Sequence, residues 1–283
     1  MSKEKKYTVR FYVGFSENGA PKISQLLKDI YNNSLNKKPI PHIKIDGKSY
    51  ELRDFISLSD GASFKGVLAT VRDDAPHIRK SNGKEETIKL NKDEGIMEKN
   101  HFLYFKKNEL LVWQQNNSAS FVGRFAQYLS AICKKTVSFD DILTKESWKK
   151  LESGNIRKFE FKVSRPKSDL IPNPSDWTQK SFDLMNGLDA NSITITTAAK
   201  RGKSLAAPTK AIIKNLLQFT EIQKLKVTPE HQEPIDLLAD RISTKINVKM
   251  DGKYPILDDI FNKLDAAKNK KQKELDEHFD ERN

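Results

Sequence analysis

The stretch around residue 200 has the residue types of a phosphate-binding loop. Gly202-Lys203-Ser204 follows an expected strand and precedes an expected helix. A loop of this kind needs a further glycine five residues before Gly202, where the backbone turns tightly around the phosphates, and that position is Thr197. No hydrophobic strand ending in Asp follows to hold magnesium. The spacing therefore argues against nucleotide hydrolysis.

A second arrangement is compatible with a magnesium-dependent nuclease. Such enzymes bring an Asp and a Glu-x-Lys motif together, so that carboxylates bind the metal and the lysine stabilises negative charge. Here Asp140 or Asp141 precedes Glu160-Phe161-Lys162, which lies on an expected strand. The motif is weak, because 31% of the residues are charged and Glu4-Lys5-Lys6 matches it as well. An exposed strand face is the simpler interpretation, and the nuclease stays the alternative.

Histidine and cysteine form no pattern typical of metal binding or catalysis. No two of the five histidines have the spacing of metal ligands. Cys133 is the only cysteine, and a lone thiol after an apolar run fits a reducing compartment. No nucleophilic-serine elbow or Cys–His signature is present. We therefore expect a non-enzymatic protein without a cofactor or a metal site. The histidines are His42, His77, His101, His231 and His278.

Positive charge is the strongest functional signal in the chain. The formal net charge is +12 over 283 residues, with an isoelectric point near 9.4. A surplus of this size usually indicates a polyanionic partner, more often nucleic acid than an anionic membrane. Residues 155–226 hold 13 basic and 6 acidic residues, more than half of the net charge. No carboxylate occurs between Asp189 and Glu221.

The acid-free segment supplies the candidate DNA contacts. Phosphate contacts need exposed cations and backbone amides rather than a fixed catalytic geometry. One group of cations lies in an expected loop, a second shares one face of an expected helix, and a third extends the surface along a neighbouring strand. In that order, the candidates are Lys200, Arg201 and Lys203, then Lys210 and Lys214, then Arg157, Lys158, Lys162 and Arg165.

Hydrophobic periodicity predicts the elements that must position these residues. Alternation of apolar and polar residues predicts strands over 7–15, 64–72, 156–163, 192–197, 223–227 and 241–250. Helical spacing predicts helices over 23–31, 121–132, 140–151, 177–185, 208–219 and 256–279. Asp46-Gly47 predicts a tight hairpin, a second hairpin is expected over 102–113, and Asn82-Gly83 marks a turn in a polar loop.

The order of these elements predicts an α+β fold with mixed or antiparallel sheets, packed helices and a C-terminal helix. Three prolines between residues 166 and 174 mark the best candidate linker. We expect two domains.

Several segments in this order resemble the RexA-like phage-exclusion proteins encoded by lambda-type prophages. The resemblance is colinear over most of the chain and lies in residues 42–50 (HIKIDGKSY), the hairpin over 102–113, residues 193–195 before the basic segment, and residues 233–248. It implies a DNA-binding homodimer that works with a membrane protein of the RexB type in abortive infection. It also implies a globular domain formed by both chain ends, residues 1–165 with 252–283, and a basic, movable domain inserted between them over 166–251. The candidate linker and the turn at Asp251-Gly252 fit such an insertion.

The expected function is therefore sequence-independent binding of duplex DNA in a phage-exclusion system, through the phosphate backbone and as a dimer. No zinc-finger spacing, basic leucine zipper or aromatic ribonucleoprotein motif indicates base readout. The charged N-terminus and the lack of a long apolar run indicate a cytoplasmic protein. The alternative is a magnesium-dependent nuclease that uses Asp140 or Asp141, Glu160 and Lys162.

Overall fold

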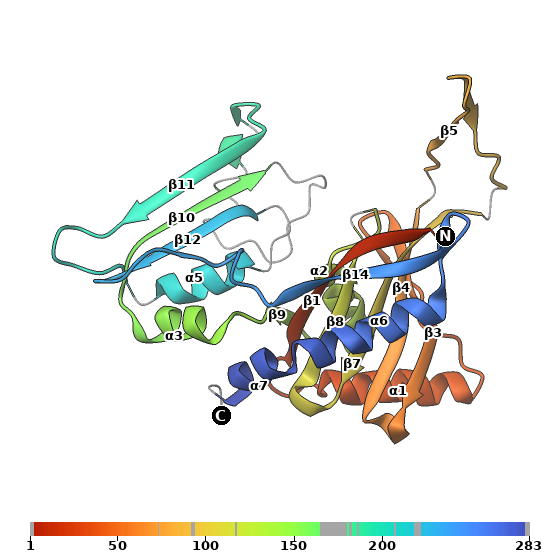
Figure 1. Ribbon diagram of the computed structural model, residues 1–283, viewed down its shortest axis with the longest axis horizontal. Helices are drawn as coiled ribbons and strands as arrows, with labels where there is room; N and C mark the ends of the chain where they lie inside the picture. Colours follow the sequence, from red (N-terminus) through yellow and green to blue (C-terminus); the bar gives the residue numbers. More distant parts are fainter. Residues whose placement is uncertain are drawn as a thin grey trace. The chain divides into compact units, whose positions relative to one another are not determined.

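The computed structural model describes residues 3–72, 74–91, 94–116, 118–164, 180, 183–185, 187–206, 208–217 and 222–280. The chain folds into two compact units (Figure 1). Unit 1 comprises residues 1–9, 14–138 and 244–267, and unit 2 comprises residues 10–13, 139–243 and 268–283. Helices combine with antiparallel sheets, so the expected α+β class is confirmed.

A nine-stranded sheet forms the framework of unit 1. Its order is β15-β14-β1-β8-β7-β4-β3-β2, and β9 also pairs with β1. Alternation explains strands such as β3, in which Tyr50 and Leu52 are buried and Glu51 between them is not. The bounds are β1 (Glu4–Ser16), β2 (Ile43–Ile45), β3 (Lys48–Leu58), β4 (Ser63–Arg72), β7 (Ile96–Phe105), β8 (Leu110–Gln115), β9 (Val137–Asp141), β14 (Ser243–Asp251) and β15 (Tyr254–Pro255).

The predicted hairpins of unit 1 are confirmed. Asp46 and Gly47 join β2 to β3 with positive φ angles of 50° and 75°, as a tight turn of this type requires. The second hairpin joins β7 to β8 through the short helical turn Lys107–Glu109. A similar turn, Ser59–Gly61, joins β3 to β4.

Three helices belong largely to unit 1, namely α1 (Ile23–Leu35), α2 (Val122–Cys133) and α6 (Leu257–Lys270). Each buries the apolar stripe expected from its spacing, as Ile23, Leu27 and Ile30 do in α1. The core is aromatic, and the ring of Phe102 lies 4.8 Å from that of Phe125 between centroids. A separate two-stranded sheet consists of β5 (His77–Arg79) and β6 (Glu85–Thr87).

Unit 2 is built on a four-stranded antiparallel sheet with the order β11-β10-β12-β13. Its strands are β10 (Ile156–Ser164), β11 (Ser192–Ala198), β12 (Ile222–Pro229) and β13 (Ile235–Asp236). Helices α3 (Lys145–Ser153) and α5 (Pro208–Leu217) lie on the same side of this sheet (Figure 1). Helix α7 (Gln272–Asp280) packs near α3, where the rings of Trp148 and His278 are 5.3 Å apart.

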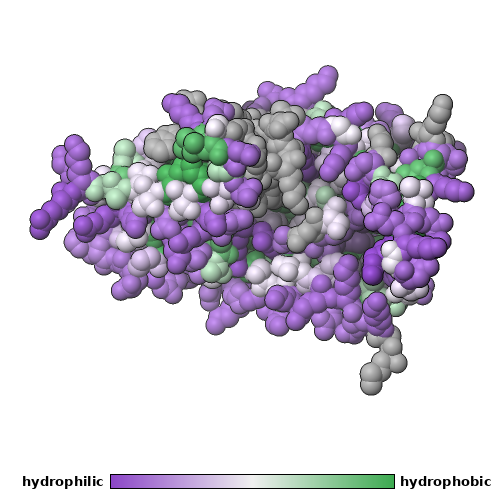
Figure 2. Space-filling view, turned by 90° about the horizontal axis from the view of Figure 1, so that it is seen from above, coloured by the Kyte–Doolittle hydropathy of each residue, from purple (hydrophilic) through white to green (hydrophobic). Residues whose placement is uncertain are grey.

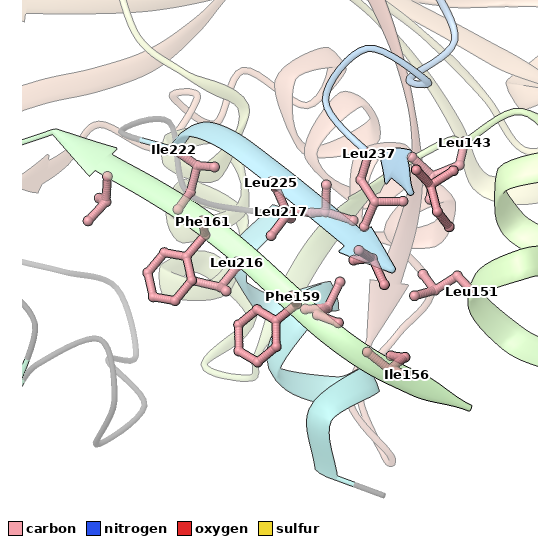
Figure 3. Packing of buried hydrophobic residues seen from close by; sticks show 14 of the residues in the cluster. Leu143, Leu151, Ile156, Phe159, Phe161, Leu216, Leu217, Ile222, Leu225 and Leu237 are labelled. Atoms are coloured by element: carbon pink, nitrogen blue, oxygen red, sulfur yellow. The ribbon is translucent and has the colours of Figure 1, made fainter. Parts of the chain in front are cut away.

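One face of the small sheet forms the core of unit 2. Phe159 and Phe161 of β10 and Leu225 of β12 are buried together with Leu216 and Leu217 of α5 (Figure 3). Burial of this apolar surface, at about 25 cal/mol per Å2, is the main force that holds α5 against the sheet.

Two predicted helices differ from the observed ones. The helix expected over 140–151 begins at Lys145, where the side chain of Thr144 accepts a hydrogen bond from the amide of Ser147. Asp140 and Asp141 instead end β9, because the preceding Val137 and Phe139 alternate into the core. The helix expected over 256–279 is divided at Lys271 into α6 and α7.

The domain division also differs from the expected boundaries. Strand β10 was expected in the first domain, but it lies at the centre of the unit 2 sheet, between β11 and β12. Unit 1 includes residues 1–9 and 244–267, whereas residues 268–283 belong to unit 2. The predicted linker over 166–174 and most of the helix over 177–185 lie outside the described residues.

Hydrophilic side chains predominate on the face of the molecule drawn in Figure 2, and hydrophobic ones form small separate patches there. Within the part of the chain that the structure describes, no helix is both long and apolar enough to cross a membrane.

Candidate nucleic-acid interface

The two faces of β10 differ sharply in chemistry. Phe159, Phe161 and Val163 are at least 96% buried and face α5 in the core. The residues that alternate with them, Lys158 and Lys162 among them, therefore project from the opposite face of the sheet. Both lysines are partly exposed. The strand thus separates an apolar core from a polar outer face.

Strand β12 adds two more lysines to this outer face. Leu225 and Val227 are fully buried, so Lys224 and Lys226 point to the other side. The register places Lys224 opposite Lys162 and Lys226 opposite Glu160. Since β10 and β12 are directly paired, the lysines of both strands lie close together on one surface.

Strand β11 extends the same surface with hydroxyl groups. Thr194 is paired with Lys162, and Thr196 is paired with Glu160, so both threonines share the outer face. Both are exposed. We call this surface the lysine face, and among the described residues it comprises Lys158, Glu160, Lys162, Thr194, Thr196, Lys224, Lys226 and Thr228. It holds no aromatic side chain.

Glu160 is the one carboxylate on strands β10, β11 and β12. Its Oε1 accepts a hydrogen bond from the Nζ of Lys224 at 2.5 Å. This bond is the largest cause that lowers the pKa of Glu160, and the charges of Lys224, Lys158 and Lys226 add to it. Lys162 and Lys224 are nevertheless like charges in directly opposite positions, an arrangement that destabilises a sheet.

The loop with Lys200, Arg201 and Lys203 adjoins the first residues of β10. The amide of Ala199 donates to the carbonyl of Arg157 at 2.8 Å, and that of Leu205 donates to the carbonyl of Ile156 at 2.8 Å. Between these two bonds the chain turns at Gly202, whose φ is +71°. All three cations of the loop are exposed, as expected.

Arg157 lies at a bulge beside this loop. The register of β10 against β12 shifts between Ile156 and Lys158, so Arg157 is the additional residue and its side chain is exposed. The loop cations and Arg157 are therefore neighbours at the end of the sheet where β10 begins.

Lys210 lies on helix α5, on the opposite side of the sheet from the lysine face. The Nζ of Lys210 donates a hydrogen bond to the carbonyl of Glu152, at the end of α3. Both helices lie on the core side of the sheet (Figure 1). Lys214 is also part of α5, but its side chain lies outside the described residues, as does Arg165. The candidate cations that the structure describes therefore lie in three places: on the lysine face, in the adjoining loop, and on helix α5 at the other side of the sheet.

Two acidic residues of the nuclease interpretation, Asp141 and Glu160, are paired with cations. Asp141 lies 3.1 Å from the guanidinium of Arg241, and both side chains are at least 91% buried. Burial raises the pKa of Asp141 to about 6, although the charges of Arg241 and Arg10 act in the opposite direction. Glu160, the second expected ligand, is bound to Lys224. Asp140 lies half-buried at the end of β9.

No metal-binding cluster is found within the described ranges, where no three His, Cys, Asp or Glu side chains lie close enough to hold an ion. The apparent phosphate loop also has a different role locally. The hydroxyl of Ser204 donates to the carboxylate of Glu230 at 3.2 Å, and the amide of Glu230 donates to the carbonyl of Asn155. These bonds fix the loop against the end of β12.

Lys224 and Lys226 were not among the residues expected from the sequence. They follow Glu221, the carboxylate that ends the acid-free segment, and so lie outside the stretch from which most of the candidates were chosen. The alternation of Lys224 and Lys226 with Leu225 and Val227 is the signal that identifies their common face.

Comparison with curated proteins gives no match. A family model does match, and it covers residues 22–275, which include nearly all elements of both units. It describes a family of unknown function, DUF6731. Because this match spans most of the 283 residues, the chain belongs to the DUF6731 family.

Proposed function

We propose that the protein is a non-enzymatic DNA-binding protein that holds the phosphate backbone of duplex DNA on the lysine face of unit 2. Binding is expected to show little sequence preference, because ammonium groups read phosphate charge and not base identity. The observation that carries the proposal is the grouping of four lysines with exposed threonines on one sheet face whose other side is the core.

The chemistry of the lysine face suits phosphates. Lysine and threonine both donate hydrogen bonds to phosphate oxygens, and their side chains follow two adjacent strands. The like-charged neighbours Lys162 and Lys224 would be stabilised by an anion placed between them. Such a pair lowers the stability of the free protein, and binding of a polyanionic ligand would explain why it is present.

Duplex DNA fits this face better than single-stranded nucleic acid. Proteins that bind single strands stack bases on exposed aromatic rings. Here the aromatic residues of the sheet, Phe159 and Phe161, are both directed into the core. A surface rich in ammonium and hydroxyl groups, without an aromatic ring, matches a ligand that presents phosphates and keeps its bases paired.

The biological setting rests on the resemblance to RexA-like proteins. We propose that the protein acts in phage exclusion as a cytoplasmic homodimer and works with a membrane protein of the RexB type. Two copies would double the number of phosphate contacts and would strengthen binding through a higher effective concentration.

Fluorescence anisotropy with a labelled duplex tests the proposed interface. The four lysines of the lysine face are replaced together, as Lys158→Thr, Lys162→Thr, Lys224→Thr and Lys226→Thr, because threonine retains the preference for strands. We expect the affinity for duplex DNA to fall at least tenfold. Single-stranded DNA and RNA of equal length are measured beside the duplex, which is expected to bind most tightly.

A matched control removes the same charge elsewhere. Lys38, Lys44, Lys48 and Lys245 are exposed residues of unit 1, and their replacement by serine also lowers the net charge by four. Equal loss of affinity in both variants would show that total charge alone matters, and the interface would then be wrong.

A further inference from the structure

The two-stranded sheet of β5 and β6 forms an arm, residues 74–91, that projects from the rest of unit 1 (Figure 1). Every residue from 76 to 87 is exposed, so this part of the arm buries no side chain. An isolated two-stranded hairpin is only marginally stable in water. The arm therefore contributes little to the core of unit 1, and its conformation suits a role in contacts with a ligand.

The end of the arm is nonetheless well defined by hydrogen bonds. The amide of Lys80 donates to the carbonyl of Lys84 at 2.8 Å, and the amide of Gly83 donates to the carbonyl of Lys80 at 3.0 Å. Asn82 accepts a further bond from the amide of Lys84 at 3.1 Å. Gly83 has the left-handed conformation, with φ of +82°, that a three-residue hairpin loop requires.

Positive charge lies nearest the end of the arm. The backbone bond between Lys80 and Lys84 places these two lysines opposite each other across the ribbon. The acidic residues lie farther back, where Glu85 is paired with Arg79 in the register and Glu86 contacts Lys80 at 2.8 Å. Opposed lysines at the end of a marginal hairpin are the same costly arrangement as Lys162 and Lys224 in unit 2.

We infer that the arm is a second contact for duplex DNA, and that its end enters a groove with Lys80 and Lys84 on the flanking phosphates. This inference rests on the proposed function. A two-stranded ribbon fits the major groove of B-form DNA, which is about 12 Å wide. Lysines on both sides of the Ser81-Asn82-Gly83 loop match phosphates on both walls of such a groove.

The salt dependence of binding tests the arm. Each lost phosphate contact makes the slope of log affinity against log salt shallower by about 0.9 on B-form DNA. The double variant Lys80→Ser with Lys84→Ser is therefore expected to change the slope by about 2 and to bind several-fold more weakly. A variant with residues 77–87 replaced by a short Gly-Ser linker should show the same loss and keep the thermal midpoint of the wild type.

The control variant Lys38→Ser with Lys44→Ser removes the same charge from exposed positions in unit 1 and is expected to retain the slope. An unchanged slope in both arm variants would overturn the inference, while the variant of the lysine face still decides the proposed function separately. The inference is also wrong if the arm variants bind duplex DNA normally but lose self-association in size-exclusion chromatography. That result would assign the arm to protein contacts.

Discussion

Glu160 limits the positive potential of the lysine face. Its carboxylate occupies the ammonium group of Lys224 and lies opposite Lys226 in the register. A phosphate that approaches this surface must compete with Glu160 for Lys224, and the carboxylate repels it directly. A partly exposed pair of this kind contributes little to stability, so its removal should change binding far more than folding.

We therefore expect Glu160→Gln to increase the affinity for duplex DNA several-fold. The freed Lys224 would add one phosphate contact, so the log–log salt slope should become steeper by about 1. Titrations at three or more salt concentrations measure both effects. Glu146→Gln is the matched control, because Glu146 is likewise paired with a lysine, Lys150, but lies on α3. If both variants increased affinity equally, the position of Glu160 would have no special role.

The same residue separates binding from nuclease chemistry. Glu160→Ala is expected to leave DNA intact in a plasmid-nicking assay with magnesium, as in the wild type, because the carboxylate is paired with Lys224 and Asp141 with Arg241. Magnesium-dependent cleavage by the wild type that disappears in Glu160→Ala or Lys162→Ala would establish the enzyme and refute the proposal.

The buried pair of Asp141 and Arg241 predicts a strong effect on stability. Removal of one partner leaves a buried charge without compensation and typically costs about 3–5 kcal/mol. We expect this loss in the free energy of unfolding for Asp141→Leu, measured in urea. The double variant Asp141→Leu with Arg241→Met should recover most of it, since a buried ion pair can often be replaced by apolar residues. A double variant as unstable as the sum of both single variants would contradict this account.

At the scale of elements, the loop and helix α5 should behave differently. The loop cations Lys200, Arg201 and Lys203 adjoin Arg157, whereas Lys210 is bound to the carbonyl of Glu152 on the core side. Reversal of the three loop cations to Glu should weaken duplex binding strongly, with a change in stability below about 0.5 kcal/mol. Lys210→Glu with Lys214→Glu should weaken it much less.

Reversal of Lys270, Lys271 and Lys273 is the control for the loop, since these residues lie near the junction of α6 and α7 and carry the same charge. If the loop variant and the control variant weakened duplex binding equally in a gel shift, the loop would not be part of the interface. If the helix variant bound DNA as weakly as the loop variant, α5 would belong to the interface.

The sequence predicted the elements of the interface better than their pairing. Alternation is a local signal, so the strands of residues 156–163 and 223–227 and the inward direction of Phe159 and Phe161 followed directly from it. The pairing of β10 with β12 joins residues 59 to 73 positions apart, and no local pattern specifies such a register. The sequence therefore indicates that Lys224 and Lys226 share one side of their strand, but only the folded sheet places that side next to β10.

Local sequence patterns also failed to predict the end of β9 and the strands β5 and β6. Asp140 and Asp141 were expected to open a helix, but the burial of Phe139 keeps this stretch in β9. The turn at Asn82-Gly83 was expected, whereas β5 and β6 were not, because their residues lack the apolar alternation of a half-buried strand.

At the scale of the whole molecule, the two units divide the expected roles. Unit 1 contains the large sheet with an aromatic core, and strands from distant segments of the chain, residues 1–9 and 244–267, belong to it. Unit 2 contains the lysine face and the basic loop on a smaller sheet. Within unit 2, the four lysines lie on one side of the sheet, and the three loop cations adjoin the same sheet. Such local grouping is the arrangement expected of a surface that binds a polyanion, in contrast to charge spread evenly for solubility.

The salt dependence of duplex binding tests the central claim most directly. The account predicts a steep log–log slope for the wild type, about −4 to −5 for five phosphate contacts. In the variant with all four lysines of the lysine face replaced by threonine, the slope should become shallower by about 3, because Lys224 is held by Glu160 in the wild type. A wild-type affinity that does not change between low and physiological salt would contradict the account, as would an unchanged slope in the variant.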